Sequence, residues 1–281
     1  MTDDNTEEAR YKFAKAATRG VSGNTAVIEE AFANVPREHF LGQGPWLKLT
    51  YDGYEETQTA NPMEVYQLRA LAIDPALGIN NGEPQLHAKM MSAIAPQLGE
   101  SIVHIGVGAG YYSAVLSRLV GQSGKVIGYE IVEHIGERAQ QNLKEYENVE
   151  IVIGSGSDNI ANADIVYVCA GATGPNRHWL DVLKPGGRLV FPLTPLEGFG
   201  GVLVVLRDAS GSRDFSARFI SPTMFMPCEG ARNEDEATAL SEVFGAKDAS
   251  SVRSLKRSYP PDETAWFVWA DDLWLSTATD K

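Results

Sequence analysis

From residue 102 onward, short apolar runs alternate with segments of helical length, and this alternation limits the fold more than any other feature. Each run has the length and the β-branched content of a buried strand. Strands that alternate with helices form a parallel sheet covered by helices on both faces. The sequence therefore predicts the α/β class, with a doubly wound, Rossmann-like sheet. Strands are expected at 102–105, 125–129, 149–153, 165–168 and 188–191, with helices at 111–120, 132–145 and 175–183.

The residues before this alternation predict two helices and an ordered loop. The charged segment 5–19 predicts a first helix, and apolar residues at helical spacing in 25–34 predict a second. Residues 42–81 are rich in Gly, Pro, Asn and aromatics and have no clear period. Because this segment also contains many apolar residues, we expect an ordered loop with short helices rather than a free linker.

The residues after the alternation predict a hairpin, a helix and an aromatic segment. Two β-rich runs, 202–206 and 215–220, are separated only by "DASGSRD", which predicts an antiparallel hairpin at one edge of the sheet. An acidic helix is expected at 234–244. The segment "AWFVWADDLWLS" at 265–276 can pack into a core, wall a substrate pocket or form a homo-oligomer contact. Of these, core packing is the prediction.

Composition excludes several classes of partner. The formal net charge is −13 and no basic run occurs, which argues against a nucleic acid as partner. No stretch approaches the roughly 18 apolar residues that span a bilayer, and the acidic start "MTDDNTEEAR" is unlike a secretory signal. Cys169 and Cys228 are too few for a disulfide framework or a zinc site. We therefore expect a cytoplasmic protein without a metal, with two thiols in a reducing compartment.

A glycine-rich turn, "IGVGAG", stands where the first strand meets its helix. Gly106, Gly108 and Gly110 permit positive φ and let a ligand approach the backbone closely. The following helix offers free N–H groups to a polar ligand. Glu130 ends the second strand, where a carboxylate commonly accepts hydrogen bonds from both ribose hydroxyls. The dinucleotide pattern would place its third glycine at Tyr111, so a different nucleoside cofactor is indicated.

This turn resembles the G-x-G-x-G turn of S-adenosylmethionine-dependent methyltransferases, and "LKPGGRLV" resembles their entry into the fifth strand. Further segments resemble one narrower family, the protein-L-isoaspartate O-methyltransferases. These segments are "AFANVPREHFL", "GVGAGYYSAVLSRLVGQSGKV", "NVEIVIGSG", "ADIVYVCAGAT" and "LKPGGRLVFPL". They are collinear with the family over roughly residues 20–230.

The resemblance implies the family's fold and S-adenosyl-L-methionine as the cofactor. The residues that it implies as cofactor contacts are His104, Gly106, Gly108, Gly110, Tyr111, Glu130, Ile131, Ser155 and Gly156.

The chain departs from the family where the family does its chemistry. Members carry G-Q-T-I-S-Q-P before the first strand, and its Thr and Ser hydroxyls stand near the methyl-acceptor carboxylate. At the same spacing from the glycine turn, this chain has "GINNGEP", with Asn80 in place of the Thr and Gly82 in place of the Ser. Ser155 stands for the family's adenine-side Asp, and His104 replaces the acidic residue before the glycine turn.

Four polar residues of this region are the candidate catalytic residues. Asn80 and Asn81 offer amides to an acceptor or to the amino-acid end of the cofactor, although Asn-Gly is also an ordinary turn dipeptide. Glu83 or His87 offers a base, which an amine or hydroxyl acceptor needs and an ionised carboxylate does not. For His87 a structural role on a helix is the alternative. His104 is either a buried core imidazole or a contact near the cofactor.

The sequence predicts a methyltransferase that acts on a peptide or small-molecule acceptor different from the family's. The alternative is a catalytically silent protein of the same fold that binds the cofactor or serves as a scaffold. The predicted division is 1–82 for the N-terminal helices and substrate-side loop, 83–232 for the S-adenosylmethionine-binding domain and 233–281 for a C-terminal extension.

Overall fold

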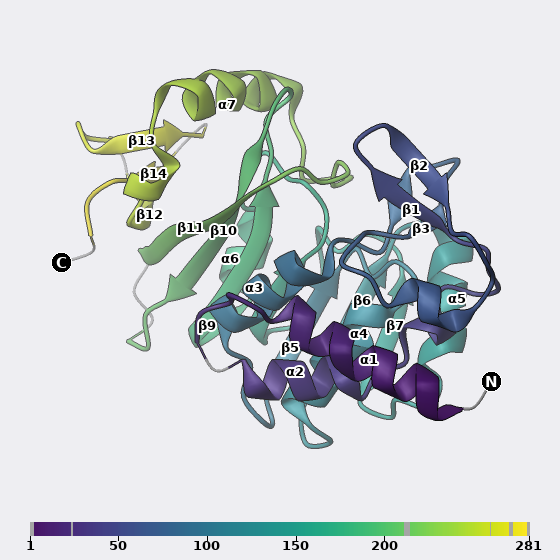
Figure 1. Cartoon of the computed structure of the whole chain (residues 1–281). Helices are drawn as coiled ribbons and strands as arrows, with labels where there is room; N and C mark the ends of the chain where they lie inside the picture. Colours follow the sequence, from purple (N-terminus) through teal and green to yellow (C-terminus); the bar gives the residue numbers. More distant parts are fainter. Residues whose placement is uncertain (1–2, 24, 211–213, 259, 270–271, 280–281) are drawn as a thin grey trace. The chain divides into compact units, whose positions relative to one another are not determined.

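The computed structural model describes residues 3–23, 25–210, 214–258, 260–269 and 272–279, and they form two compact units (Figure 1). The first unit comprises the chain up to residue 101 together with residues 107–154. The second comprises residues 102–106 and the chain from residue 155 onward.

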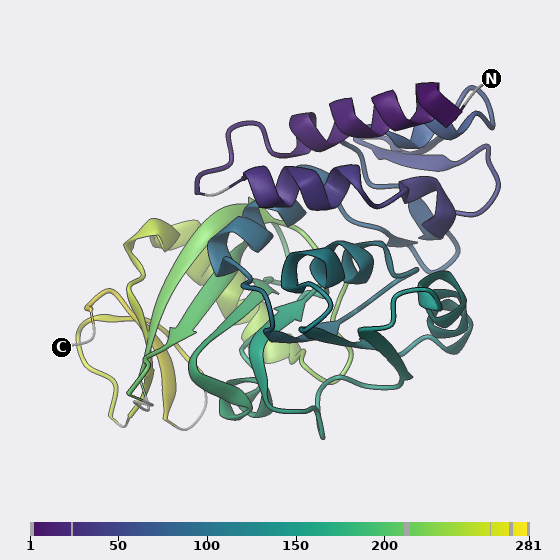
Figure 2. The ribbon, with the colours of Figure 1, turned by 90° about the horizontal axis from the view of Figure 1, so that it is seen from below.

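Helices α1 (Asp3–Ala17) and α2 (Ala26–Ala33) open the first unit. They lie side by side (Figure 2), and the rings of Phe13 and Phe32 meet between them with centroids 6.1 Å apart. Burying one apolar stripe of each helix is what stabilises such short helices in water. Both predicted N-terminal helices are confirmed. Two 3₁₀ turns, η1 (Arg37–Phe40) and η2 (Pro62–Val65), follow.

The segment 42–81 contains two small antiparallel hairpins, so the expectation of a loop with short helices was wrong for much of it. Strand β1 (Leu47–Thr50) pairs with β2 (Gly53–Glu56), and β3 (Ala72–Asp74) pairs with β4 (Ile79–Asn80). Strands of two to four residues are too short to leave a readable alternation of apolar and polar residues in the sequence.

The rest of the first unit follows the predicted alternation. It contains α3 (Pro84–Ile94), α4 (Tyr111–Val120), β6 (Lys125–Glu130), α5 (Glu133–Leu143) and β7 (Val149–Ile153). Strands β6 and β7 pair in parallel, with Gly128 opposite Ile151. Helix α4 packs on β6 and α5 packs on both strands, as expected for strand–helix–strand crossovers.

The second unit is built on a sheet in which parallel and antiparallel strands are joined. Strand β5 (Ser101–Ile105) pairs in parallel with β8 (Ala163–Val168), and β8 pairs in parallel with β9 (Leu183–Leu193). A short helix, α6 (Arg177–Asp181), lies between β8 and β9 in the chain. These parallel strands confirm the predicted α/β class.

The predicted hairpin consists of β10 (Gly200–Arg207) and β11 (Phe215–Thr223); β10 lies beside β9, and β11 lies on the other side of β10 (Figure 1). Residues 211–213 of its connection lie outside the described residues. The antiparallel hairpin is confirmed, and the sheet continues beyond it with β12 (Ser254–Arg257), β14 (Leu273–Ser276) and β13 (Ala265–Val268). Helix α7 (Glu234–Ala246) and the turn η3 (Ala249–Ser251) precede these strands.

The aromatic segment near the C-terminus packs into the second unit. Trp266, in β13, meets the rings of Phe219 and Phe244, and Trp269 donates a hydrogen bond to the carbonyl of Thr173 at 2.7 Å. Trp266, Trp269 and Trp274 are all buried. The prediction of core packing is confirmed for the described part of the segment, which excludes residues 270 and 271.

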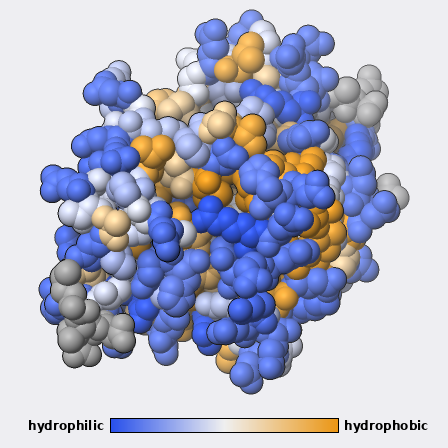
Figure 3. Space-filling model, turned by 90° about the vertical axis from the view of Figure 1, so that its right-hand side faces the viewer, coloured by the Kyte–Doolittle hydropathy of each residue, from blue (hydrophilic) through white to orange (hydrophobic). Residues whose placement is uncertain are grey.

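Hydrophilic side chains cover most of the face in Figure 3, as the charge of the chain leads one to expect. Among the residues that the structure describes, no helix is both long and apolar enough to span a bilayer.

Candidate functional site

The glycine turn of the first unit connects Val107 to α4 through two glycines in the left-handed region. Gly108 has φ +57° and Gly110, the N-cap of α4, has φ +99°. A Cβ on Gly108 would lie 2.9 Å from Cδ1 of Ile73, and one on Gly110 would lie 2.7 Å from Cδ1 of Leu143. Both positions therefore favour glycine for backbone conformation, and a Cβ at either would displace the end of a neighbouring side chain.

Glu130 joins the end of β6 to this turn. Its carboxylate accepts hydrogen bonds from the amides of Gly108 at 2.7 Å and Val132 at 3.1 Å, and the side chain is buried. Burial raises the pKa of Glu130 above its ordinary value, while these backbone amides act in the opposite direction. The next residue, Ile131, is 41% exposed and presents an apolar surface beside the carboxylate. Two carboxylate oxygens provide about four acceptor sites, so ribose hydroxyls can share them with the amides.

The raised pKa of Glu130 predicts a pH dependence of cofactor affinity. If Glu130 holds the ribose, as the sequence predicts, the hydroxyls donate to its ionised carboxylate, and affinity for S-adenosylhomocysteine should rise with pH from 4.5, the ordinary value, through the raised pKa. Over the same window the contribution of Glu130 to folding stability falls, because the folded state holds this proton more tightly than the unfolded chain. Glu130→Gln should weaken binding by about 1.5–3 kcal/mol and remove the pH dependence.

Calorimetric titrations at several pH values measure this effect. Glu133→Gln is the matched control, because Glu133 is exposed in the first turn of α5. A pH dependence that survives in Glu130→Gln, or is lost in Glu133→Gln, contradicts the assignment.

His87 lies against the first turn of α4. Its ring is buried and stacks on Tyr112, with centroids 3.5 Å apart and planes 6° apart. Gly82 has φ +70°, and a Cβ built on it would overlap Nε2 of His87. The imidazole thus fills the space that a side chain at position 82 needs. Glycine at 82 and histidine at 87 fit each other as a pair.

The other three candidate catalytic residues use their side chains to shape the same segment. Asn80 accepts a hydrogen bond from the amide of Gly82 at 2.9 Å, which is a local turn contact. Glu83 is the N-cap of α3, where its carboxylate accepts from the amides of Gln85 and Leu86 at 3.2 and 2.6 Å. The side-chain oxygen of Asn81 points inward, as described next. The structure therefore brings Gly82, His87 and the start of α4 together, while the catalytic roles of the four candidate residues stay predictions.

Arg37 holds the residues before and within this motif through hydrogen bonds, and sequence reasoning did not single it out. The side chain is fully buried. It donates to the carbonyls of Val65, Gln67 and Arg69 at 2.7–2.9 Å and to the side-chain oxygen of Asn81 at 3.2 Å. The same Asn81 oxygen accepts from the amide of Leu71 at 2.8 Å. Arginine is rarely fully buried, so the residue type does not indicate that this position is buried.

The hairpin of β3 and β4 also lies on the glycine turn, through the contact of Ile73 with Gly108. Beside it, Asp74 is held by His134 of α5, whose Nε2 lies 2.9 Å from the carboxylate. The hydrogen bond with His134 lowers the pKa of Asp74. Sequence reasoning missed these contacts, because they join segments that are far apart in the chain, by sixty residues for Asp74 and His134.

Tyr111, which begins α4, is the last of the predicted cofactor residues that lie in the first unit. Its ring is buried and makes an edge contact with Phe40 at 5.7 Å. Burial raises the pKa of this phenol. Tyr111 therefore belongs to the core beneath the turn.

In the second unit, His104 is a buried imidazole near the end of β5. Its Nε2 lies 3.3 Å from Sγ of Cys169, and its ring meets Tyr167 edge-on. Burial lowers the pKa of His104 to about 3, so the ring is neutral at physiological pH. A Cβ on Gly106 would meet the backbone of Cys169 at 3.3 Å. Glycine there permits the close approach of the chain after β8.

Ser155 and Gly156 are the first residues of the longer of the two chain segments that form the second unit, which begins at residue 155. The exposed Ser155 accepts a hydrogen bond from the amide of Ser157 at 3.1 Å. Gly156 is buried, and its carbonyl accepts from the indole N–H of Trp179 at 2.9 Å. Their roles toward a cofactor stay predictions. Within the described ranges, no group of three or more His, Cys, Asp or Glu is arranged to hold a metal ion.

Residues 13–233 match the family model of protein-L-isoaspartate(D-aspartate) O-methyltransferases. The chain belongs to this family. It is therefore a methyltransferase of the S-adenosyl-L-methionine-dependent class, as the resemblance of its motifs implied. Helix α7 and strands β12–β14 lie beyond the matched residues.

Known members of this methyltransferase family share modest identity with the chain. A protein-L-isoaspartate O-methyltransferase of Rhodopseudomonas palustris is 32% identical over 218 residues, which are 74% of this chain and 87% of that protein. A solved protein-L-isoaspartate O-methyltransferase is 25% identical with a TM-score of 0.61, and covers 79% of this chain and 66% of its own.

A second solved structure shares the fold. It is a Plasmodium falciparum protein that its description calls a beta-aspartate methyltransferase, in complex with S-adenosyl-L-homocysteine. Its TM-score is 0.62 at 15% identity, covering 78% of this chain and 98% of its own.

Proposed function

We propose that this methyltransferase transfers the methyl group of S-adenosyl-L-methionine to a peptide or small-molecule acceptor other than an isoaspartyl side chain. The observation that carries the proposal is the overlap between His87 and the side-chain space at Gly82. The family's Ser hydroxyl stands at position 82 in the motif. Here that position has no side chain, and an imidazole lies where one would be.

The first unit fits the cofactor at its glycine turn. Gly108 and Gly110 leave the backbone uncovered by side chains of their own, and Glu130 is a buried carboxylate beside them. We assign Glu130 to the ribose hydroxyls and the exposed apolar side chain of Ile131 to the face of the adenine. When bound, the cofactor supplies an electrophilic methyl group on a sulfonium. The roles predicted for Tyr111, His104, Gly106, Ser155 and Gly156 stay part of the proposal.

On the acceptor side, His87 is the residue that distinguishes the classes of acceptor. An amine or hydroxyl acceptor must lose a proton, and a neutral imidazole nitrogen accepts one. A carboxylate acceptor is already ionised, so His87 then acts only through shape and hydrogen bonding. Asn80 and Asn81 set the backbone path through this motif, and Glu83 fixes the start of the helix that carries His87.

The alternative is a catalytically silent member that keeps the fold and the cofactor. It is favoured by the loss of hydroxyls at both motif positions, Asn80 and Gly82. Cofactor binding without transfer to any acceptor supports this alternative. The predicted division at residues 82 and 232, the cytoplasmic location and the homo-oligomer also stay predictions.

Two measurements on the full chain test the proposal. Calorimetry with S-adenosylhomocysteine should show binding, and its absence at about 1 mM ligand contradicts the cofactor assignment. Transfer of labelled methyl from S-adenosylmethionine is then measured on peptides and metabolites that bear carboxylates, amines or hydroxyls. Transfer to an amine or hydroxyl that is lost in His87→Ala, with S-adenosylhomocysteine affinity retained, assigns His87 as the base.

A further inference from the structure

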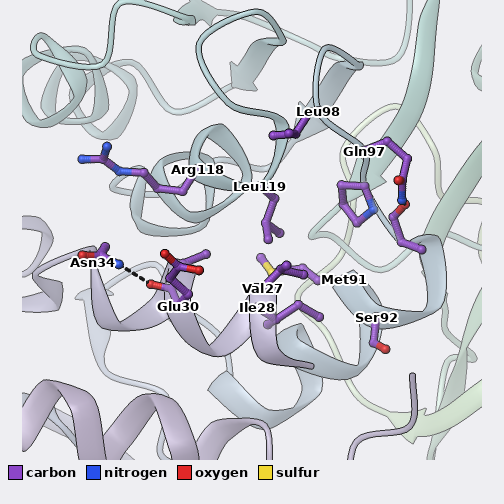
Figure 4. Close-up of a pocket in the computed structure, with 13 residues that line it drawn as sticks. Val27, Ile28, Glu30, Asn34, Met91, Ser92, Gln97, Leu98, Arg118 and Leu119 are labelled. Atoms are coloured by element: carbon purple, nitrogen blue, oxygen red, sulfur yellow. Dashed lines mark hydrogen bonds between the residues drawn. The ribbon is translucent and has the colours of Figure 1, made fainter. Parts of the chain in front are cut away.

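A pocket of about 530 Å³ lies in the first unit, at the ends of α3 and α4 opposite to those that carry His87 and the glycine turn (Figure 4). Its volume is within the range of small-molecule sites, roughly 300–1,000 Å³. It is lined by α2, by the last residues of α3 with the segment 96–98, and by Arg118 and Leu119 of α4. About seven residues of helix, or about 10 Å, separate Arg118 from the start of α4.

The floor of the pocket is apolar and buried. Ile28, Met91 and Leu119 project into it from three different helices (Figure 4), and each is at most 7% exposed. At the mouth, Val27 and Leu98 are 47% and 78% exposed. Exposed apolar side chains around a buried apolar floor suit an apolar body that enters from solvent. Methionine adapts its shape to such a body.

The charged residues at the mouth of the pocket determine which polar group a ligand should carry. Glu30 and Arg118 lie at the same side of the pocket (Figure 4). The guanidinium of Arg118 is placed over the ring of Tyr146, 5.5 Å from its centroid. The carboxylate of Glu30 has no hydrogen bond or ion pair with any residue in the described part of the chain. The net charge of −13 also favours a cation.

We propose that this pocket binds a small amphipathic amine, with its apolar body on Ile28, Met91 and Leu119 and its ammonium group at Glu30. The site is separate from the glycine turn, so the inference does not depend on the proposed function. The ligand class follows from one apolar floor and one unpaired carboxylate at its edge, among the residues that the structure describes.

The test compares three probes that share one chain and differ in charge: n-octylamine, n-octanol and n-octanoate. Titration of the full chain with methionine methyl groups labelled for NMR localises binding, because Met91 lines the pocket and Met90, also buried in α3, does not. We expect n-octylamine to shift the Met91 signal and to bind about threefold tighter than n-octanol, the effect of one exposed ion pair.

Three variants sharpen the result. Glu30→Gln should bring n-octylamine to the affinity of n-octanol, whereas Glu29→Gln, on the same helix but bonded to Thr18, should not. Ala31→Met, which adds a side chain at the lining, should abolish binding of all three probes. Tighter binding of n-octanoate, an unmoved Met91 signal or competition with S-adenosylhomocysteine overturns the proposal.

Discussion

Replacing Arg37 with methionine is expected to lower the free energy of unfolding by about 3–5 kcal/mol. The side chain is fully buried and satisfies three backbone carbonyls and the side-chain oxygen of Asn81. Each buried acceptor left without a donor costs about 1–3 kcal/mol. Part of that loss is offset, because a buried charge is itself costly and burial already lowers the pKa of Arg37.

Urea unfolding of the wild type and variants measures this loss. Arg69→Met is the matched control, since Arg69 is exposed in the segment that Arg37 holds, and a change within about 0.5 kcal/mol is expected there. Arg37→Lys should fall between the two, because one ammonium cannot reach all the acceptors. Equal stability of Arg37→Met and Arg69→Met contradicts the role given to Arg37.

Isoaspartyl peptides should be methylated about 10²–10³-fold more slowly by this chain than by family members that carry both hydroxyls. Losing one positioned hydrogen bond to a reacting group commonly has an effect of that size. The measurement is labelled methyl transfer to an isoaspartyl peptide, beside a family member with the G-Q-T-I-S-Q-P motif. Comparable rates contradict the proposed change of acceptor.

Gly82→Ser alone should not restore this activity, because the new Cβ overlaps His87 at a φ of +70°. Gly20→Ser is the control that separates the backbone strain of a positive φ from the overlap with His87. Gly20 has φ +75°, but no atom lies within 4 Å of the position that its Cβ would take. Gly82→Ser should therefore be the more destabilising of the two. In a His87→Ala background the difference should disappear, and isoaspartyl transfer by Gly82→Ser should rise. Unchanged stability of Gly82→Ser in the wild-type background contradicts the overlap.

The glycine turn and the carboxylate that we propose for the cofactor could be predicted from the sequence because their signals are local, while their role toward the cofactor stays a prediction. Gly108 and Gly110 stand two positions apart in the turn, and Glu130 ends the following strand. In the structure the turn and Glu130 are in contact, because the carboxylate accepts a hydrogen bond from the amide of Gly108. The alternation of strands and helices was sufficient to place the glycines at the end of the first strand and Glu130 at the end of the second.

The part of the candidate site that would face the methyl acceptor was harder to predict from the sequence. The sequence showed that Asn80 and Gly82 replace the family's hydroxyls, but not what takes their place. For Asn81 the sequence left a ligand contact and an ordinary turn open, and it did not indicate that the side-chain oxygen accepts from Arg37 and from the amide of Leu71. The two small hairpins in residues 42–81 were missed, because strands of this length carry no readable period.

By itself the sequence determined the α/β class, the strand and helix positions from 102 to 191, the family and the glycine turn. The class and the element positions depend on periodicity, the turn on glycines that it requires for its backbone, and the family on the resemblance of its motifs. Only the tertiary structure decided that Arg37 is buried and that His87 occupies the space beside Gly82. Arg37 meets Asn81 across 44 residues of chain, and no local pattern records which distant segments a fold brings together.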